Sequence, residues 1–217
     1  MTDTASPFSE MTLGAFSRAL SSAETVPGGG SASAVAAALA AALVTMVARL
    51  SQERPAKLTH VAGHARAIEA TESARTRLLA LADDDAAAYA AFAQARRLPR
   101  ETPAQQAARS AAVNASALRA AEVPLAVVRT CHGLVDQIEV LVSRSTADSA
   151  SNLDVAALLA EAAARGAGAN ILVNLHDVDD QRLSATLLSE SEVRLHEIRS
   201  TVARIHGLVR SRGARSA

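Results

Sequence analysis

Long alanine-rich stretches, interrupted at only a few proline or glycine positions, constrain the fold of this chain most strongly. Alanine loses no side-chain entropy in a helix and leucine loses little, whereas a sheet protein would need more β-branched and aromatic residues. Aromatic residues make up only 2% of the 217 residues, and tryptophan is absent. The sequence therefore predicts an all-α protein, an up-and-down bundle of long helices in a single domain over residues 1–217, with flexible ends at 1–10 and 211–217.

Proline, glycine and capping residues place the expected helix ends. Ser31 is expected to cap a helix after the break at residues 26–30, and Pro124 to kink or break another. Asn152 or Asp154 would cap the helix that follows a polar loop at 147–152, and Gly166 and Gly168 are expected to weaken the middle of that helix. The only strand-like run is 170–175. The expected helices cover residues 12–22, 31–50, 56–97 with a bend near 83–85, 102–124, 125–143, 155–165 and 181–209.

Charge and cysteine content narrow the partners and the compartment. The 22 basic residues balance the 22 acidic ones, which disfavours nucleic acid as a partner. Cys131 is the single cysteine and is interpreted as a buried structural thiol, so we expect a reducing, cytoplasmic location. The start of the chain lacks the pattern of a signal peptide. The apolar run 32–48 is interpreted as a buried helix, and no membrane partner is expected.

A glycine-rich turn is the first candidate binding element. Pro27, Gly28, Gly29, Gly30 and Ser31 precede an alanine-rich helix. Glycines let backbone N–H groups come close to a ligand, and the start of a helix adds a positive dipole end. This combination suits an anion or the polar edge of a heterocycle. From the local sequence alone, a tight turn with close helix packing explains the same residues.

An acidic run and a polar pair supply further candidates. Asp83, Asp84 and Asp85 lie in one predicted helix, where neighbours are about 100° apart, so only one or two can face inward. A carboxylate with a raised pKa could deliver or accept a proton, and otherwise all three acids would be solvated. Asn170 and Asn174 are four residues apart, a spacing that puts them on one face of a helix.

Three segments in order resemble the cyclodeaminase/cyclohydrolase family of tetrahydrofolate enzymes. They are the turn at 27–31 with its helix to Leu50, the stretch from Asp85 to Arg100, and the stretch from Ser151 to Leu175. The resemblance covers about nine-tenths of the chain. It implies an all-helical homodimer that converts 5-formimidoyltetrahydrofolate to 5,10-methenyltetrahydrofolate and ammonia, or hydrolyses the methenyl form to 10-formyltetrahydrofolate. It also implies a stand-alone domain that uses no metal or organic cofactor beyond its folate substrate.

The resemblance also assigns roles to residues. It makes Asp85 the catalytic acid or base. It makes Pro27, Gly28, Gly29, Gly30, Ser31, Asn152, Asn170 and Asn174 substrate-binding residues.

Two departures from the family pattern keep other functions open. Asn152 stands where the family has an aspartate; an amide cannot ionise but can hydrogen-bond a pterin. Lys57 is displaced from the lysine-containing stretch that the family often has after the alanine-rich helix, and Arg100 stands where the family often has a lysine. Either cation could meet a folate carboxylate, and a solvated surface role explains both equally well. The alternative reading is a catalytically altered member, either a ligand-binding accessory protein or an enzyme for a non-folate substrate. His60 and His64 have metal-ligand spacing, but a surface or packing role is preferred because no third ligand is evident.

Overall fold

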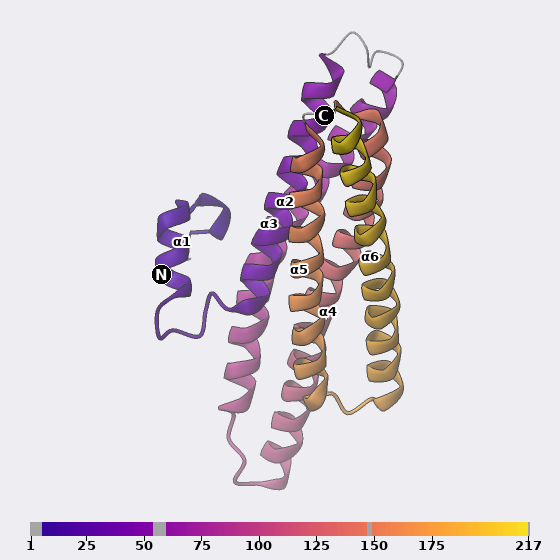
Figure 1. The fold of residues 1–217 in the computed structure, drawn as a ribbon. Helices are drawn as coiled ribbons and strands as arrows, with labels where there is room; N and C mark the ends of the chain where they lie inside the picture. The colour runs from indigo at the N-terminus through magenta and orange to yellow at the C-terminus, as the bar shows by residue number, and fades with distance from the viewer. Residues whose placement is uncertain (1–5, 54–59, 147–148, 217) are drawn as a thin grey trace.

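The computed structural model describes residues 6–53, 60–146 and 149–216, and every α-helix in these ranges except the first belongs to one bundle. Figure 1 shows α2 to α6 running along a common axis, with the short α1 set to one side. No strand occurs within these ranges. The predicted all-α bundle is confirmed. Its elements in order are η1 Phe8–Glu10, α1 Leu13–Leu20, α2 Gly29–Gln52, α3 Val61–Arg96, α4 Pro103–Arg144, α5 Ala150–Asn174, η4 Leu175–Asp177 and α6 Gln181–Ser216.

Helix α2 packs against α3, α4 and α5. Its inward residues are mainly alanines, and Ala34, Ala37 and Ala41 have no exposed surface. Such small side chains let neighbouring helix axes approach closely, as the composition indicated. The larger core residues come chiefly from α4, where Leu125, Ile138 and their apolar neighbours are buried.

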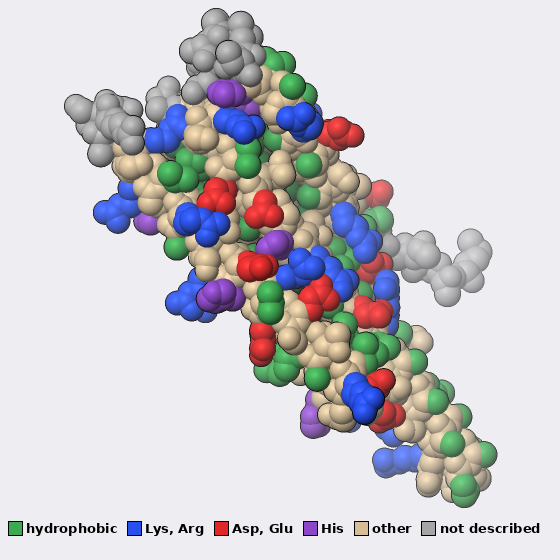
Figure 2. All heavy atoms as spheres, turned by 90° about the vertical axis from the view of Figure 1, so that its right-hand side faces the viewer, with side chains coloured by type: hydrophobic (Ala, Val, Ile, Leu, Met, Phe, Trp, Pro, Cys, Tyr) green, Lys and Arg blue, Asp and Glu red, His purple; other side chains and the backbone are tan. Residues whose placement is uncertain are grey.

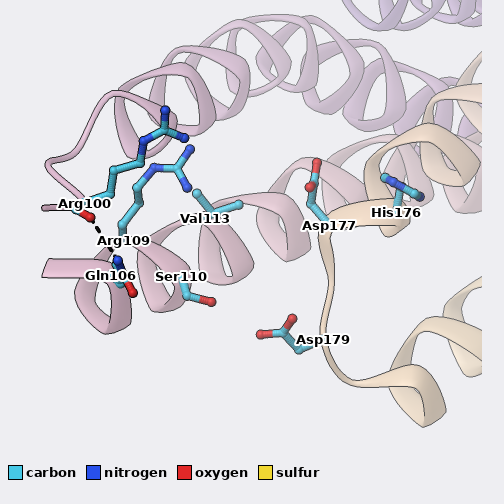
Figure 3. A pocket seen from close by; sticks show the side chains of 8 residues that line it. All are labelled: Arg100, Gln106, Arg109, Ser110, Val113, His176, Asp177 and Asp179. Carbon is cyan, nitrogen blue, oxygen red and sulfur yellow. Dashed lines mark hydrogen bonds between the residues drawn. The ribbon is translucent and has the colours of Figure 1, made fainter. Parts of the chain in front are cut away.

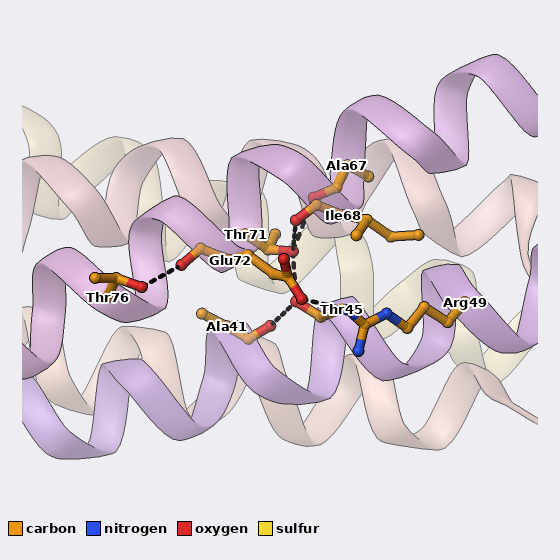
Figure 4. A network of polar contacts seen from close by, with 8 residues as sticks. All are labelled: Ala41, Thr45, Arg49, Ala67, Ile68, Thr71, Glu72 and Thr76. Atoms are coloured by element: carbon orange, nitrogen blue, oxygen red, sulfur yellow. Dashed lines mark hydrogen bonds and ion pairs between the residues drawn. The ribbon is translucent and has the colours of Figure 1, made fainter. Parts of the chain in front are cut away.

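A pair of buried threonines joins α2 to α3 (Figure 4). The Thr45 and Thr71 hydroxyls are hydrogen-bonded at 2.7 Å. A carbonyl oxygen one turn earlier in the same helix, at Ala41 and Ala67 respectively, also lies within hydrogen-bond distance of each hydroxyl. Because each hydroxyl carries one proton, one threonine donates to the other, and the second donates to the carbonyl of its own helix. Buried hydroxyls are costly unless they are satisfied, and this arrangement satisfies both. One turn further along α2, Arg49 forms an ion pair with Glu72 of α3.

The glycine-rich break is shorter than predicted. Helix α2 begins at Gly29 with Gly28 as its N-cap, so Ser31 is the third helical residue and not the cap. Two glycines are tolerated here because the first-turn N–H groups have no partner within the helix in any case. The Ser31 hydroxyl instead faces α3, where it shares its one proton between an Asp85 carboxylate oxygen at 2.9 Å and the Ala82 carbonyl oxygen at 3.1 Å.

The prediction that Pro124 ends a helix is wrong, because α4 continues through it to Arg144. A proline at this position removes the hydrogen bond that residue 124 would donate to the Ala120 carbonyl. In this fold the side-chain nitrogen of Asn174 donates to that carbonyl at 2.7 Å. A donor from another helix thus replaces the lost bond.

Helix α5 also differs from the sequence-based expectation. It begins after Ser149, so Asn152 and Asp154 lie inside it and do not cap it, and the strand-like run 170–175 is helical except for its last residue. Gly166 and Gly168 do not weaken it because neighbours pack against them. A Cβ added at Gly166 would lie 2.5 Å from the Ser33 hydroxyl oxygen of α2, and one at Gly168 would lie 2.7 Å from a methyl group of Leu195 in α6.

The remaining boundaries agree more closely. Thr12 caps α1 by accepting a hydrogen bond from the Ala15 N–H, and α3 ends one residue before the predicted position. The predicted start of α3 at 56, and residues 147–148 of the predicted loop, lie outside the described residues. Helix α6 extends past 209 to Ser216, and the flexibility of the chain ends stays a prediction.

Three stretches are long and apolar enough to cross a membrane, by length and composition alone. They are α2, α4 and the continuous α5–η4 segment. The most apolar window, in α2, is 61% buried inside the bundle, which accounts for much of its composition. Within the described residues, the predicted burial of the run 32–48 is confirmed. The absence of a membrane partner stays a prediction.

The face of the bundle at α6 carries charges of both signs. Figure 2 shows basic and acidic side chains interspersed over it. Two arginine–carboxylate pairs join α4 and α6 there. Arg129 contacts Glu190 with an N–O distance of 2.6 Å, and Arg204 contacts Glu139 at 2.6 Å. This mixed surface gives no basic patch of the kind that nucleic-acid binding requires.

Candidate active site

The site is built where the first turn of α2 meets the middle of α3. Asp85 of α3 points at the start of α2, directly against Gly30. A Cβ at position 30 would lie 2.0 Å from one carboxylate oxygen of Asp85. The carboxylate can occupy this place only because residue 30 has no side chain. This close approach is the physical reason for that glycine.

Ser31 forms hydrogen bonds with the Asp85 carboxylate. Its hydroxyl donates to Oδ2 at 2.9 Å, and its backbone N–H is a second donor. Burial raises the pKa of Asp85 above its ordinary value, while the two hydrogen bonds from Ser31 partly oppose the rise. A carboxyl group with a raised pKa keeps its proton to a higher pH than an ordinary aspartate, which suits a general acid or base.

The three consecutive acids face different partners, as the helical geometry required. Asp83 accepts a hydrogen bond from the Phe8 N–H at 2.8 Å. Asp84 lies 3.7 Å from the Arg119 guanidinium. Only Asp85 of the three lines the cavity between α2 and α3, so the prediction that one or two acids face inward is confirmed.

A cavity of about 210 Å³ opens in front of Asp85. It brings together six of the residues singled out from the sequence. Its lining consists of Thr25, Val26, Gly28, Gly29, Gly30, Asp85, Tyr89, Phe92, Ala120, Asn170 and Asn174.

Two aromatic rings of this cavity were not recognised as site residues. Tyr89 and Phe92 lie at helical spacing in the sequence. Tyr89 is 43% exposed, and both rings line the cavity. The signal was present in the sequence, because positions 89 and 92 lie four and seven residues after Asp85, on the same face of α3. A flat aromatic wall beside a carboxyl group suits a planar heterocycle.

The two asparagines of α5 share the face that lines the cavity, as their spacing predicted. Asn174 donates from its amide nitrogen to the Ala120 carbonyl. Asn170 lies one turn earlier and lines the same cavity. The cavity therefore combines an ionisable acid, two amides and the N-terminal turn of a helix.

Three predicted residues do not line this cavity. Ser31 is fully buried beneath Asp85 and acts on it rather than on a ligand. Pro27 lines a neighbouring cavity of about 600 Å³ with Phe8 and Met11. Asn152 lies 18 residues before Asn170 on α5, roughly 27 Å along the helix axis at 1.5 Å per residue. In a single chain, Asn152 and Asp85 do not meet.

A second, more polar cavity of about 370 Å³ lies beyond the aromatic wall (Figure 3). Arg100 and Arg109 line it, with Gln106, Ser110, Val113, His176, Asp177 and Asp179. Figure 3 shows the guanidinium groups of the two arginines side by side. Lys57, the other cation considered from the sequence, lies outside the described residues.

Arg96 connects the two cavities. Its guanidinium lies 5.6 Å from the centre of the Phe92 ring, on the side of the Asp85 cavity. The same side chain contacts Asp177 of the second cavity at 3.6 Å. From Asp85 to Arg96 the distance along α3 is roughly 16 Å. Arg96 thus contacts one residue of each cavity, Phe92 of the first and Asp177 of the second.

The remaining candidate groups serve the packing of the bundle. His64 is buried with Nε2 3.1 Å from the Arg144 carbonyl oxygen, and its ring lies 6.3 Å from that of His60. Burial raises the pKa of the Cys131 thiol to about 12, which confirms its interpretation as a buried structural thiol. Within the described residues, no three His, Cys, Asp or Glu side chains gather as a metal site would require. The predicted lack of a metal stays a prediction.

Known proteins resemble this chain over nearly all of its length. The sequence profile of the formiminotransferase-cyclodeaminase family matches residues 12–193. A methenyltetrahydrofolate cyclohydrolase of Methylorubrum extorquens is 33% identical over 201 residues, which are 93% of this chain and 97% of that protein. A formimidoyltransferase-cyclodeaminase of Sus scrofa is 32% identical over 93% of this chain, but the match spans only 37% of that longer protein.

A solved structure shares the fold. The crystal structure of formiminotetrahydrofolate cyclodeaminase from Thermotoga maritima superimposes with a TM-score of 0.85 at 25% sequence identity. The match covers 94% of this chain and 98% of that one. Sequence and structure comparisons therefore agree on the same group of proteins.

Proposed function

Since the chain belongs to the formiminotransferase-cyclodeaminase family, we propose that it is a folate one-carbon enzyme that hydrolyses 5,10-methenyltetrahydrofolate to 10-formyltetrahydrofolate. The observation that carries the proposal is the Asp85 carboxyl group. It is half-buried, has a raised pKa, and stands at the mouth of a cavity with an aromatic wall and two amides. A relative that matches over 93% of this chain and 97% of its own length bears the name of this activity.

The chemistry needs one group that moves a proton at the bridging carbon. Water attacks the methenyl carbon, and Asp85 accepts the proton that this water loses. The bond from N5 to that carbon then breaks as N5 takes up the proton from Asp85, and the second proton of the water leaves to solvent as the formyl C=O forms. The formyl group remains on N10. One carboxyl group therefore serves both steps.

The cyclodeaminase reaction is the second candidate. The family name and the Thermotoga maritima structure favour it. There N10 would attack the protonated formimidoyl group and lose its own proton to Asp85, and Asp85 would pass that proton to the departing nitrogen, which leaves as ammonia. The product would be the methenyl form. Both reactions use the same acid at the same carbon, so the substrate that reacts decides between them.

The two cavities that Arg96 connects suit the shape of a folate. The pterin would lie against Tyr89 and Phe92, near Asp85. The benzoyl-glutamate part would extend past Arg96 toward Arg100 and Arg109, whose charges complement a carboxylate. The substrate carries the one-carbon unit itself, so the proposal needs no metal or organic cofactor.

The Asn152 substitution leaves this proposal intact. Asn152 lies at the far end of α5, so an asparagine there removes no ionisable group from the Asp85 cavity of the same chain. An accessory protein that binds folate without turnover remains the alternative. This alternative predicts that the protein binds folate without converting it.

A homodimer is part of the proposal. Helix α2 exposes Leu39, Met46 and Leu50 on one side, and α5 exposes Val155, Leu158, Leu172 and Val173. Apolar stripes of this length on two packed helices are typical of subunit contacts. Sedimentation of a stable monomer at low micromolar concentration would contradict this part.

The test is a spectrophotometric assay of purified protein with each folate in turn. Decay of the methenyl absorbance, accelerated by the wild type and not by Asp85→Ala, supports the hydrolase. A rise from the formimidoyl substrate supports the deaminase. If neither folate reacts with protein that binds it, the accessory reading replaces the proposal. Asn152→Asp would then be the first variant to examine for restored turnover.

A further inference from the structure

Pro124 occupies a position where α4 would normally form a backbone hydrogen bond. In an α-helix, the N–H of residue 124 would donate to the carbonyl oxygen of Ala120. Proline has no N–H, so this carbonyl is left to another donor. Pro124 is among the buried residues of α4. Water is therefore a poor substitute donor at this point of the chain.

Asn174 supplies the donor, and this fixes its orientation. Its side-chain nitrogen lies 2.7 Å from the Ala120 oxygen. A carbonyl oxygen can only accept a hydrogen bond, so the amide must turn its nitrogen, not its oxygen, toward Ala120. The two ends of the amide, which are otherwise interchangeable, are thereby distinguished by a residue 50 positions earlier in the chain.

The orientation matters because both partners belong to the candidate active site. Ala120 and Asn174 line the same cavity as Asp85. With its nitrogen bound to Ala120, the Asn174 amide keeps its oxygen as a hydrogen-bond acceptor for a ligand. A pterin carries ring N–H and amino groups at its edge. Those groups are donors and match an acceptor.

We propose that Pro124 is a positioning residue of the active site: by withholding a backbone N–H, it reserves the Ala120 carbonyl for Asn174 and so holds the Asn174 side-chain oxygen as an acceptor for an N–H group of the substrate. The identity of that substrate rests on the proposed function. The arrangement of Pro124, Ala120 and Asn174 does not.

The variant Pro124→Ala tests the idea directly. It restores an N–H at residue 124 that donates to the Ala120 carbonyl oxygen within the helix. The oxygen has a second lone pair, so Asn174 still reaches it, but its hydrogen bond is weakened and no longer the one that satisfies this carbonyl. Alanine is the better helix former, so α4 is expected to remain folded. We expect the KM for 5,10-methenyltetrahydrofolate to rise about tenfold, the effect of losing one hydrogen bond, with a smaller change in kcat. Pro103→Ala is the matched control, because Pro103 is the first residue of α4 and no helix bond is missing there.

A double variant separates positioning from a general packing role. If Pro124 acts through Asn174, then Pro124→Ala combined with Asn174→Ala raises KM no more than Asn174→Ala alone. Independent effects would multiply, to roughly a hundredfold. Multiplying effects would overturn the proposal.

A second readout does not depend on activity. Nuclear magnetic resonance should show slow hydrogen exchange for the Asn174 side-chain amide in the wild type and faster exchange in Pro124→Ala, with no change in Pro103→Ala. Unchanged exchange in Pro124→Ala would overturn the arrangement. If exchange changes as expected but the wild type turns over neither folate, then the arrangement stands and the proposed function fails.

Discussion

Replacing Gly30 with alanine should disable the site through a single methyl group. The new Cβ would lie 2.0 Å from one Asp85 oxygen, 2.5 Å from the carboxyl carbon and 2.6 Å from the other oxygen. Ordinary contact begins at 3.4 Å, so the carboxyl group must withdraw by roughly 1.4 Å, the difference between the two. The backbone of α2 moves less easily than the Asp85 side chain, because α2 is packed against α3, α4 and α5.

That withdrawal has a cost in stability and a larger one in activity. It stretches the Ser31–Asp85 hydrogen bond, now 2.9 Å, beyond bonding distance. A hydrogen bond to a charged group contributes about 1.5–3 kcal/mol. The gain in helix propensity from glycine to alanine offsets at most about 1 kcal/mol of this. We expect a net loss of about 1 kcal/mol. Since a misplacement of about 1 Å can lower a rate by roughly a hundredfold, kcat/KM should fall by that order.

Gly29→Ala is the matched control. It places the same methyl group one residue earlier in the same turn, and nothing lies within 4 Å of it. This variant should keep wild-type activity and melt at the same or a slightly higher temperature. The assay is methenyl turnover together with thermal unfolding monitored by circular dichroism. Wild-type kcat/KM in Gly30→Ala, or an equal loss in both variants, would refute the reasoning.

Three further predictions concern ionisable groups. Asp85 has a raised pKa in the folded state, so the wild type loses stability as pH rises from about 4 through that pKa. The melting temperature of Asp85→Asn should therefore rise relative to that of the wild type over this pH range. A difference in melting temperature that stays constant down to pH 3 would contradict this. Hydrogen bonds from Arg129 and Arg194 hold the pKa of Glu190 at about 2, so Glu190→Gln should cost about 1 kcal/mol in urea unfolding at pH 7, and the cost should vanish as pH falls from about 4.5 through about 2; a cost that persists at pH 2 would speak against the ion pairs. Burial raises the pKa of Cys131 to about 12, so a thiol reagent should label the native protein only as fast as it unfolds, and rapid stoichiometric labelling at pH 7 would show that the thiol is accessible.

Three of the errors in the predicted fold have a common origin. Pro124, Gly166 and Gly168 are helix breakers by local propensity, and each lies inside a continuous helix. In each case a neighbour from another helix compensates, through a hydrogen bond from Asn174 or through close packing at the glycines. Local rules cannot include a partner that the chain supplies 50 residues later.

The sequence predicted most of the individual residues of the candidate site, but it did not predict which of them come together in one cavity. The spacing of Asn170 and Asn174 and the separation of the three aspartates followed from helical geometry alone. The sequence did not identify Tyr89 and Phe92 as site residues, because apolar spacing does not reveal whether a helix face meets another helix or a cavity. Asn152 was grouped with Asp85 by motif, although the two lie far apart in one chain.

The sequence by itself determined that this protein is a bundle of long helices, since alanine and leucine at helical spacing leave few other ways to form a core. It also determined which side chains share a helix face, because that depends only on the period of the helix. The tertiary structure alone decided that Gly30 admits the Asp85 carboxylate, that burial raises the pKa of that acid, and that Ala120 receives its hydrogen bond from Asn174. These three facts depend on contacts between different helices, and the site's chemistry arises from them.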